Sequence, residues 1–437
     1  MNSNNNPWAA KRSWISILMF VIGATSSIDY SLIGRVTVAE TIAFLFVPYF
    51  WLSNHRSYVN ANLKKSIWLL ALMFFGVIVA DFINQNYFLF SARAFARPVF
   101  MMGFLLFFIP VLARDPLSII YLVYGRVLTG IVNYFRPSQF EQGGATDASS
   151  YAGVVFRLEP LIWAIAVAFA VYIYPRNRLL AALSFLGGGA TVILVGGARS
   201  GILIWASAAA MIFAIKWLKS ATSHRITLTK ASIAGLGMLG FIVLSTMYFL
   251  YIWAAPRGYL GEVQESKMME QQQTVFGATP LGFLVAGRPQ VYGAVLGILD
   301  RPILGFGSWR HDLTSIYVVE AMASVGTNPK LMDQLSVSGS AGGAGHSVLF
   351  QGWVENGVVP TVSYIGIFII IMRVFLFNIR YENRLTPYFI VTIAGFTWAF
   401  LFSPPGLGLR FSIGLYLAFY VVFMDKQKAL ARVAVLP

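Results

Sequence analysis

Long apolar segments recur along most of the chain, and short polar stretches separate them. Segments of about 16 to 25 residues, if helical, match a bilayer hydrocarbon core of roughly 30 Å. Backbone groups inside lipid must be hydrogen-bonded within the protein, which restricts a spanning structure to helices or a closed barrel. The segments are too continuously apolar for barrel strands, whose side chains alternate between lipid and lumen. The pattern predicts an all-α polytopic membrane protein.

We expect about twelve transmembrane helices, near residues 13–29, 36–53, 66–84, 98–113, 117–135, 158–174, 178–196, 199–217, 230–254, 357–378, 385–402 and 409–425. Pro110, Arg114 and Pro116 crowd the connection between the fourth and fifth segments. The first apolar run is expected to be an uncleaved span rather than a signal peptide. The segment Ser347 to Asn356 is expected to form an interfacial or re-entrant helix before the tenth span.

One long polar interval divides the chain into three parts. Residues 1–254 are predicted to hold N-terminal transmembrane helices, 255–346 a large periplasmic loop, and 347–437 C-terminal transmembrane helices. Within the loop, residues 262–273 are polar and helix-compatible, and 283–307 contain an apolar helical pattern. A loop this long is usually functional or disordered, and its aliphatic and aromatic content favours a folded, functional segment.

Composition agrees with this class of protein. The 437 residues are 57% hydrophobic and 11% charged, against about 25% charged in soluble domains. The absence of cysteine excludes disulfides, thiol nucleophiles and cysteine metal sites. The net charge of +15 fits basic cytoplasmic loops or an anionic substrate, whereas nucleic acid is not expected without a soluble domain.

The distribution of basic residues predicts the topology. If both termini lie in the cytoplasm, each of the seven loops and tails on that side is basic, as the positive-inside rule requires. That rule leaves one group of arginines on the outer side unexplained: Arg93, Arg97, Arg136, Arg157, Arg199, Arg257, Arg288, Arg301 and Arg310. We therefore expect the periplasmic face to receive an anion.

Four histidines are available for proton transfer. His55 and His224 fall in cytoplasmic loops beside Lys and Arg, and His311 has no supporting pattern. His346 follows a Gly/Ser/Ala-rich tract (336–345) at a predicted helix start on the arginine-rich side. Histidine can accept a proton from a hydroxyl near neutral pH. From position alone, a catalytic base and a residue that only caps the helix or contacts headgroups are equally good interpretations.

Three outer arginines are candidate phosphate ligands. Arg199 lies in Gly196–Gly201, where a helix N-terminus and a guanidinium together suit a phosphate, although an arginine snorkelling at a helix end is common. Arg288 alone is an ordinary loop arginine, and Arg157 beside Glu159 fits a structural ion pair.

No P-loop, HExxH or GxSxG pattern occurs. No Asp-x-Asp or Glu-x-Asp pair stands on the outer side to hold a divalent metal on a diphosphate. We therefore expect arginines to neutralise the charge, with no metal and no cofactor.

Three elements lie in order on the predicted outer side: Arg199 with Leu203, Arg288 ahead of Pro302-Ile303-Leu304-Gly305-Phe306-Gly307, and His346-Ser347 followed after nine residues by Gly357. Together they resemble the O-antigen ligase family of membrane glycosyltransferases, which is related to the O-antigen polymerases. The likeness covers mainly residues 150–360. Pro360 departs from it, because the family has a small or aromatic residue there.

The resemblance implies a GT-C-like fold in the bacterial inner membrane with a periplasmic active site. It implies metal-independent transfer of a glycan from undecaprenyl diphosphate to lipid A-core. His346 would be catalytic, and Arg199, Arg288 and Arg157 would bind the diphosphate.

Other functions stay open. An O-antigen polymerase or protein O-oligosaccharyltransferase would use the same donor with a different acceptor. A transporter of lipid-linked oligosaccharide would need ionisable residues within its spans, for which Arg35, Asp81 and Arg126 are the candidates. A structural scaffold would give no reason for the outer arginines.

Overall fold

The protein is helical, apart from one short hairpin in the part described. The computed structural model describes residues 14–31, 35–54, 58–135, 151–194, 199–221, 249–259, 289–325, 347–403 and 407–433, with single positions between 235 and 272. The longer helices are α1 (Trp14–Ala24), α2 (Val38–Asn54), α3 (Ala61–Ile83), α4 (Phe88–Arg114), α5 (Ile119–Phe135), α6 (Tyr151–Ile173), α7 (Arg178–Leu194), α8 (Arg199–Ala221), α12 (Pro289–Asp300), α13 (His311–Val325), α15 (Val348–Asn356), α16 (Val358–Arg380), α17 (Thr386–Phe402) and α18 (Leu407–Val433). Short 3-10 turns, η3 and η4, occupy Pro116–Ser118 and Ala255–Arg257.

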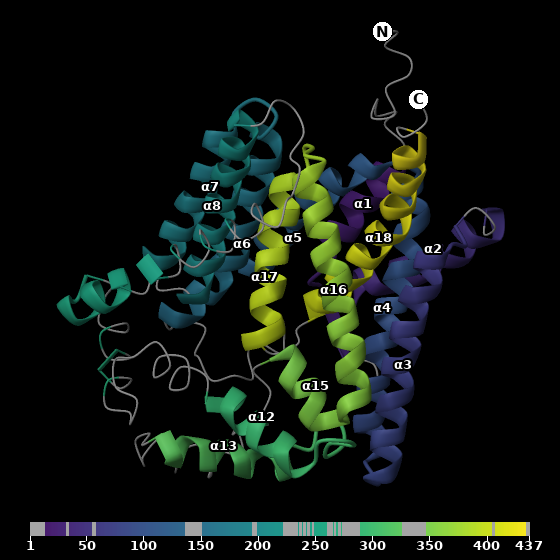
Figure 1. The fold of residues 1–437 in the computed structure, drawn as a ribbon, viewed down its shortest axis with the longest axis vertical. Helices are drawn as coiled ribbons and strands as arrows, with labels where there is room; N and C mark the ends of the chain where they lie inside the picture. Colours follow the sequence, from purple (N-terminus) through teal and green to yellow (C-terminus); the bar gives the residue numbers. More distant parts are fainter. Residues whose placement is uncertain are drawn as a thin grey trace.

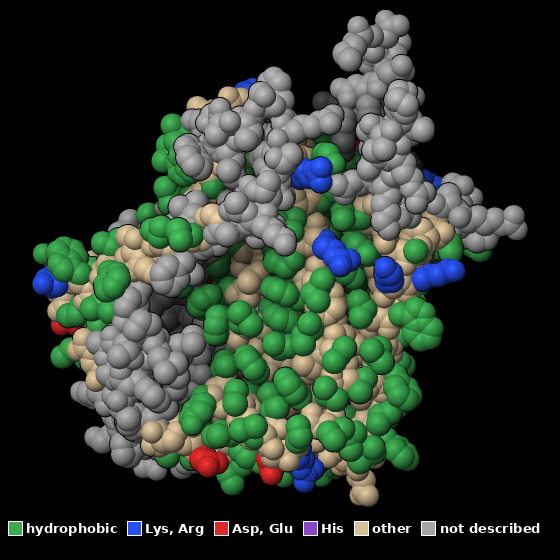
Figure 2. All heavy atoms as spheres, viewed as in Figure 1, with side chains coloured by type: hydrophobic (Ala, Val, Ile, Leu, Met, Phe, Trp, Pro, Cys, Tyr) green, Lys and Arg blue, Asp and Glu red, His purple; other side chains and the backbone are tan. Residues whose placement is uncertain are grey.

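The apolar segments predicted from the sequence coincide with these helices, except that 230–254 lies mostly outside the described residues. In the described part, α3, α4 and α16 are long and apolar enough to cross a membrane, and shorter apolar helices accompany them. On the face in Figure 2, hydrophobic side chains form a broad band, and most Lys and Arg lie on one side of it. The fold is therefore that of an apolar helical bundle suited to a membrane.

The helices are arranged around two hydrophobic cores. In the bundle, α4 packs against α18, α2 and α3, while α16 packs against α3 and α18. Its large core includes the fully buried rings of Phe104, Phe107 and Phe389. A second, smaller core joins α12, α13 and α15 through residues such as Ile298 and Val318. Figure 1 shows α12 and α13 across one end of the bundle, while α18 runs toward the other end.

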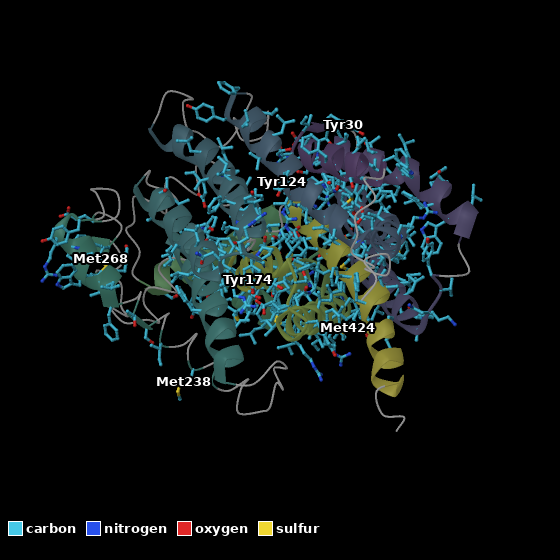
Figure 3. The ribbon with its side chains drawn as sticks, turned by 90° about the horizontal axis from the view of Figure 1, so that it is seen from above. Tyr30, Tyr124, Tyr174, Met238, Met268 and Met424 are labelled. Atoms are coloured by element: carbon cyan, nitrogen blue, oxygen red, sulfur yellow. The ribbon has the colours of Figure 1, made fainter. Side chains whose placement is uncertain are left out.

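Viewed along the bundle, Tyr124 and Tyr174 lie among its helices, and Met268 lies on a segment beside it (Figure 3). The loop predicted over 255–346 thus contains folded structure. The apolar pattern over 283–307 forms α12, as predicted. Helix α13 was not predicted, although its buried residues Thr314, Val318 and Met322 recur at helical spacing. The polar stretch 262–273 lies mostly outside the described residues.

Two helices begin earlier than the sequence predicts. Helix α4 was expected to start at Pro98 but begins at Phe88, so Arg93 and Arg97 lie within a helix and not in a loop. Residues 88–97 contain strong helix formers and no glycine, and a proline inside an apolar helix is tolerated where neighbouring groups replace the lost hydrogen bond. Helix α6 begins at Tyr151, which places Arg157 inside it.

A hairpin replaces the simple loop expected over 29–35. Strands β1 (Asp29–Ser31) and β2 (Arg35–Thr37) pair antiparallel and lead directly into α2. Thr37 and Glu40 then form a reciprocal capping box, in which Glu40 accepts from the Thr37 N–H at 2.6 Å and Thr37 Oγ1 accepts from the Glu40 N–H at 3.1 Å. The Thr-x-x-Glu spacing was the available signal for this helix start.

Helices α1 and α5 approach each other through glycine. A Cβ added to Gly125 would lie 2.2 Å from the Phe20 carbonyl oxygen, and one added to Gly23 would lie 2.2 Å from that of Leu122. The Thr129 hydroxyl donates to the Gly23 carbonyl at 2.8 Å across the same contact. Small residues that allow close backbone approach are typical of helix pairs in membranes.

Candidate functional site

The four predicted site residues lie partly outside the described structure. His346 and Arg288 are not among the described residues, but each directly precedes one that is, Ser347 and Pro289. Arg199 is the first residue of α8, and Arg157 lies in α6, but neither side chain is described. The convergence of these four side chains therefore stays a prediction, whereas their sequence neighbours Ser347 and Pro289 are described.

Ser347 fixes the chain immediately after His346. It is fully buried, and its Oγ accepts from the Phe350 N–H at 3.1 Å, which caps α15. The same hydroxyl donates to the Phe400 carbonyl oxygen at 2.8 Å, near the end of α17. One serine therefore caps its own helix and binds that helix to α17.

The start of α8 lies at the level of Phe400 on helix α17. The two helices pack together and run antiparallel (Figure 1), and a Cβ added to Gly395 would lie 4.0 Å from Ile204 Cγ2. From Ile204 to Arg199, and from Gly395 to Phe400, each helix advances by five residues, or about 7.5 Å. The Arg199 backbone therefore lies at the level of Phe400, to which Ser347 is bonded.

The Pro302–Gly307 segment wraps around the other end of α15. The Phe306 N–H donates to the Val354 carbonyl at 2.9 Å, and the Gly307 N–H donates to the Glu355 carbonyl at 2.8 Å. The carbonyls at a helix C-terminus have no partner within the helix, and this segment supplies two of them with partners. Gly305 and Gly307 adopt φ values of 65° and 91°, a region that favours glycine.

Gly357 makes the sharp junction between α15 and α16. Its φ is 77°, and a Cβ there would lie 1.9 Å from the Ile303 carbonyl oxygen. The Val358 N–H donates to that same oxygen at 3.0 Å. The glycine of the His-Ser-x9-Gly pattern is thus explained by packing. Pro360 is accommodated because it lies in the first turn of α16, where no N–H is required.

Asp81, near the end of α3, binds the residue that follows the Pro302–Gly307 segment. Its Oδ1 accepts from the Ser308 N–H at 2.6 Å and from Asn86 Nδ2 at 3.1 Å. Ser308 Oγ in turn donates to Asn356 Oδ1 at 2.8 Å. Asp81 was considered as a residue of a transport pathway, but these bonds give it a structural role.

A buried polar network along α15 was missed by the sequence reasoning. Gln351 Nε2 donates to Glu355 Oε1 at 2.7 Å, and both side chains are buried. Arg97 of α4 hydrogen-bonds Tyr364 and interacts electrostatically with Glu355. Glu355 was noted only as the one charged residue in its segment, and nothing in the sequence indicated that Arg97 would lie near it.

Glu159 of α6 lies near the start of α8. Its Oε1 would be 3.4 Å from a Cβ added to Gly201, in the first turn of α8. A carboxylate near a helix N-terminus interacts favourably with the helix dipole. Helix α6 therefore places an acidic group at the start of the helix that Arg199 opens.

Two arginines lie inside apolar helices with contrasting surroundings. Arg410 of α18 pairs with Glu40 at 3.0 Å, donates to the Arg35 carbonyl at 2.8 Å, and lies over the Phe100 ring. Arg126 of α5 lies over the ring of Phe411, 4.7 Å from its centroid. No hydrogen bond or ion pair joins Arg126 to another residue in the described part of the chain.

Ring contacts are what the described residues offer Arg126. A charged side chain within a membrane helix is costly, and each cation–π contact returns about 0.5 to 2 kcal/mol. Among the described residues, Arg410 has an ion pair in addition to its ring contact, whereas Arg126 has ring contacts without an ion pair.

Comparison of the sequence with protein-family models and with curated proteins found no match. Within the described ranges, no group of three or more His, Asp or Glu side chains is arranged to hold a metal ion.

Proposed function

We propose that this protein is a membrane glycosyltransferase of the O-antigen ligase type. It would move a glycan from undecaprenyl diphosphate to lipid A-core at the periplasmic face of the bacterial inner membrane. The sequence resemblance motivates the proposal. The observation that carries it is the Ser347–Phe400 hydrogen bond, because it brings the residue after His346 to the level at which Arg199 opens α8.

The chemistry follows from the residue types. His346 would take the proton of the acceptor hydroxyl, which then attacks the anomeric carbon with inversion. Arg199, Arg288 and Arg157 would bind the diphosphate and stabilise its charge as it leaves, a contribution of about 3 kcal/mol per donor in comparable sites. Arginines then serve in place of a metal ion.

The proposed topology has about twelve spans, with both termini in the cytoplasm and the loop of residues 255–346 in the periplasm. The basic residues of the cytoplasmic loops support it. So does the arrangement in Figure 1, where α12 and α13 lie at the end opposite the last turns of α18. A lipid-linked donor would reach such a site from the outer leaflet.

The acceptor is what distinguishes the ligase from the other enzymes that use this donor. A polymerase or a protein O-oligosaccharyltransferase would use the same donor site, so lipid A-core, a second lipid-linked glycan and a polypeptide should each be offered as acceptor. Transfer to lipid A-core alone supports the ligase.

The deciding experiment uses purified protein reconstituted with both lipid substrates, with and without a chelator. We expect transfer in both conditions, and its loss in His346→Ala, Arg288→Ala and Arg199→Ala. His311→Ala and Arg301→Gln are matched controls from the same loop, and both should transfer normally. Full activity of His346→Ala would refute the mechanism, and movement of the donor across the membrane without transfer would favour a transporter.

A further inference from the structure

Arg126 remains outside the proposed catalytic machinery, yet its surroundings are unusual for a charged residue. It is the eighth of seventeen residues in α5, near the middle of an apolar helix. Its side chain is only partly buried. Over the residues that the structure describes, its contacts are aromatic, at 4.7 Å from the Phe411 ring centroid and 6.0 Å from that of Trp163.

These contacts come from separate helices. Trp163 belongs to α6 and Phe411 to α18, and two tyrosines, Tyr388 of α17 and Tyr416 of α18, interact electrostatically with Arg126. The guanidinium thus reaches from α5 toward helices far away in the sequence. Phenol and indole groups can donate hydrogen bonds to an anion, and none of these four residues carries a negative charge at neutral pH.

Arg410 provides the internal comparison. It is adjacent in sequence to Phe411, and its charge is balanced by Glu40 at 3.0 Å. The chain therefore supplies an acidic partner to one arginine of this region and none, among the described residues, to the other. Charged groups within membrane helices are usually paired or functional, so an arginine with no acidic partner among the described residues is a candidate for binding an anionic ligand.

The position restricts which ligand this can be. Phe411 lies four residues inside the start of α18, or about 6 Å along the helix. Thr129, one turn beyond Arg126, bonds to the last residues of α1, Gly23 and Ala24. The guanidinium thus lies about one turn inside the start of α18 and the end of α1. A dissolved anion has no reason to enter at this depth, whereas the phosphate of a lipid lies close to it.

We propose that Arg126 binds the phosphate group of a lipid that enters between α5, α6 and α18. Arginine matches paired phosphate oxygens with its fork of N–H donors, and the rings of Trp163 and Phe411 hold that fork in place. The choice of a polyprenyl diphosphate as this lipid rests on the proposed function. In that case the site would receive the carrier before its diphosphate reaches the arginines of the proposed catalytic site.

The test measures binding and not transfer. The purified full-length chain in detergent is titrated with undecaprenyl diphosphate, phosphatidylglycerol or inorganic diphosphate, and the unfolding temperature is followed, because a ligand that binds only the folded state raises it. We expect undecaprenyl diphosphate to stabilise the wild type. Arg126→Gln should need about tenfold more of it for the same shift, and Arg126→Lys should lie between the two.

The matched control is Arg114→Gln, which removes an exposed arginine that also lies over a ring, 5.3 Å from the Phe50 centroid. This variant should respond to the lipid like the wild type. In the absence of lipid, Arg126→Gln should unfold at or above the wild-type temperature, because it loses a charge that has no acidic partner among the described residues. An unfolding transition in this range would also show that the variant folds.

The outcomes separate this inference from the proposed function. An equal shift in wild type and Arg126→Gln overturns it, and so does the absence of any shift with either lipid. Stabilisation by inorganic diphosphate to the same extent overturns the lipid assignment. An equal, Arg126-dependent effect of phosphatidylglycerol supports a general lipid-phosphate site. His346→Ala should keep the lipid-induced shift in unfolding temperature while losing transfer. If the wild type shows the lipid-induced shift but no transfer, the ligase function is refuted and the Arg126 site is not.

Discussion

Two close contacts in this protein both depend on glycine, but they are built differently. Where α1 meets α5, helical glycines let two backbones approach, and packing holds the pair together with the Thr129 hydroxyl, which bonds to the Gly23 and Ala24 carbonyls. Where α15 meets Pro302–Gly307, the glycines have positive φ values, and backbone hydrogen bonds join the two segments. The first contact requires small size, whereas the second requires both small size and a special conformation. Helices α1 and α5 can move apart to relieve a clash, but the hydrogen-bonded junction at Gly357 cannot.

The largest effect is expected for Gly357→Ala. Its Cβ would lie 1.9 Å from the Ile303 carbonyl oxygen at a φ of 77°, and we expect a loss of about 4 kcal/mol in stability. Hydrogen exchange should rise in α12, α13 and α15 but not in α1 and α5. Gly187→Ala is the control, because nothing lies within 4 Å of its added Cβ, and it should be neutral or stabilising. A normal exchange pattern in Gly357→Ala would contradict the rigid junction.

Gly125→Ala should have a smaller effect, although its Cβ would lie at a similar 2.2 Å from the Phe20 carbonyl. A shift of α1 away from α5 relieves the clash at a cost of about 2 kcal/mol. Thermal unfolding of the purified protein measures the loss, and exchange should rise at Thr129 while the α15 region stays protected. If Gly125→Ala were as damaging as Gly357→Ala, the distinction between the two contacts would fail.

Asp81→Ala tests a buried side-chain hydrogen bond next to the junction of α15 with Pro302–Gly307. It would leave the buried Ser308 N–H without its 2.6 Å acceptor and destabilise the contact between the end of α3 and Ser308 by about 2 kcal/mol. Asp81→Asn retains the Oδ1 acceptor and should lose less than half as much. Equal losses in the two variants, measured by chemical unfolding, would show that charge and not hydrogen bonding is what matters at this position.

The smallest effect concerns the bond between α12 and α13. The Tyr317 hydroxyl donates to Asp300 Oδ2 at 2.5 Å, and burial, together with this bond, raises the pKa of Tyr317 to about 12. Because the pKa is raised above its ordinary value near 10, the stabilisation is complete below pH 10 and is lost as pH rises toward 12. Tyr317→Phe should lose about 0.5 kcal/mol at pH 8, and its unfolding temperature should fall less than that of the wild type between pH 9 and 11. Parallel pH profiles would argue against this role.

Apolar segments predicted the existence of the bundle helices well, because a helix in an apolar environment is dictated by length and hydropathy. Their beginnings were predicted poorly. The starts at Phe88 and Tyr151 were missed because single arginines, Arg93, Arg97 and Arg157, interrupt otherwise apolar residues and were assigned to loops or helix ends. The spacing of apolar residues predicted α12. A helical spacing also occurs over α13, but no helix was predicted there.

For the site, the sequence motifs predicted positions but not their physical reasons. Gly305, Gly307 and Gly357 were taken from a pattern, and the structure explains them through φ and backbone contact. The partners of Asp81 and Glu355 depend on long-range packing, which one sequence without comparison does not encode in any local signal. Whether His346, Arg288, Arg199 and Arg157 converge stays a prediction.

The capping box at the start of α2 has a consequence for how the chain is made. Glu40 organises its own helix within three residues, but its buried carboxylate also awaits Arg410, which is synthesised almost at the end of the chain. Asn60 is in the same situation, because its side chain donates to the Val421 carbonyl at 3.0 Å. During biosynthesis, the first helices therefore enter the membrane with polar groups whose partners have not yet left the ribosome. The last helix completes the earliest part of the protein, and a ribosome stalled before α18 would leave an inserted intermediate open to quality-control proteases.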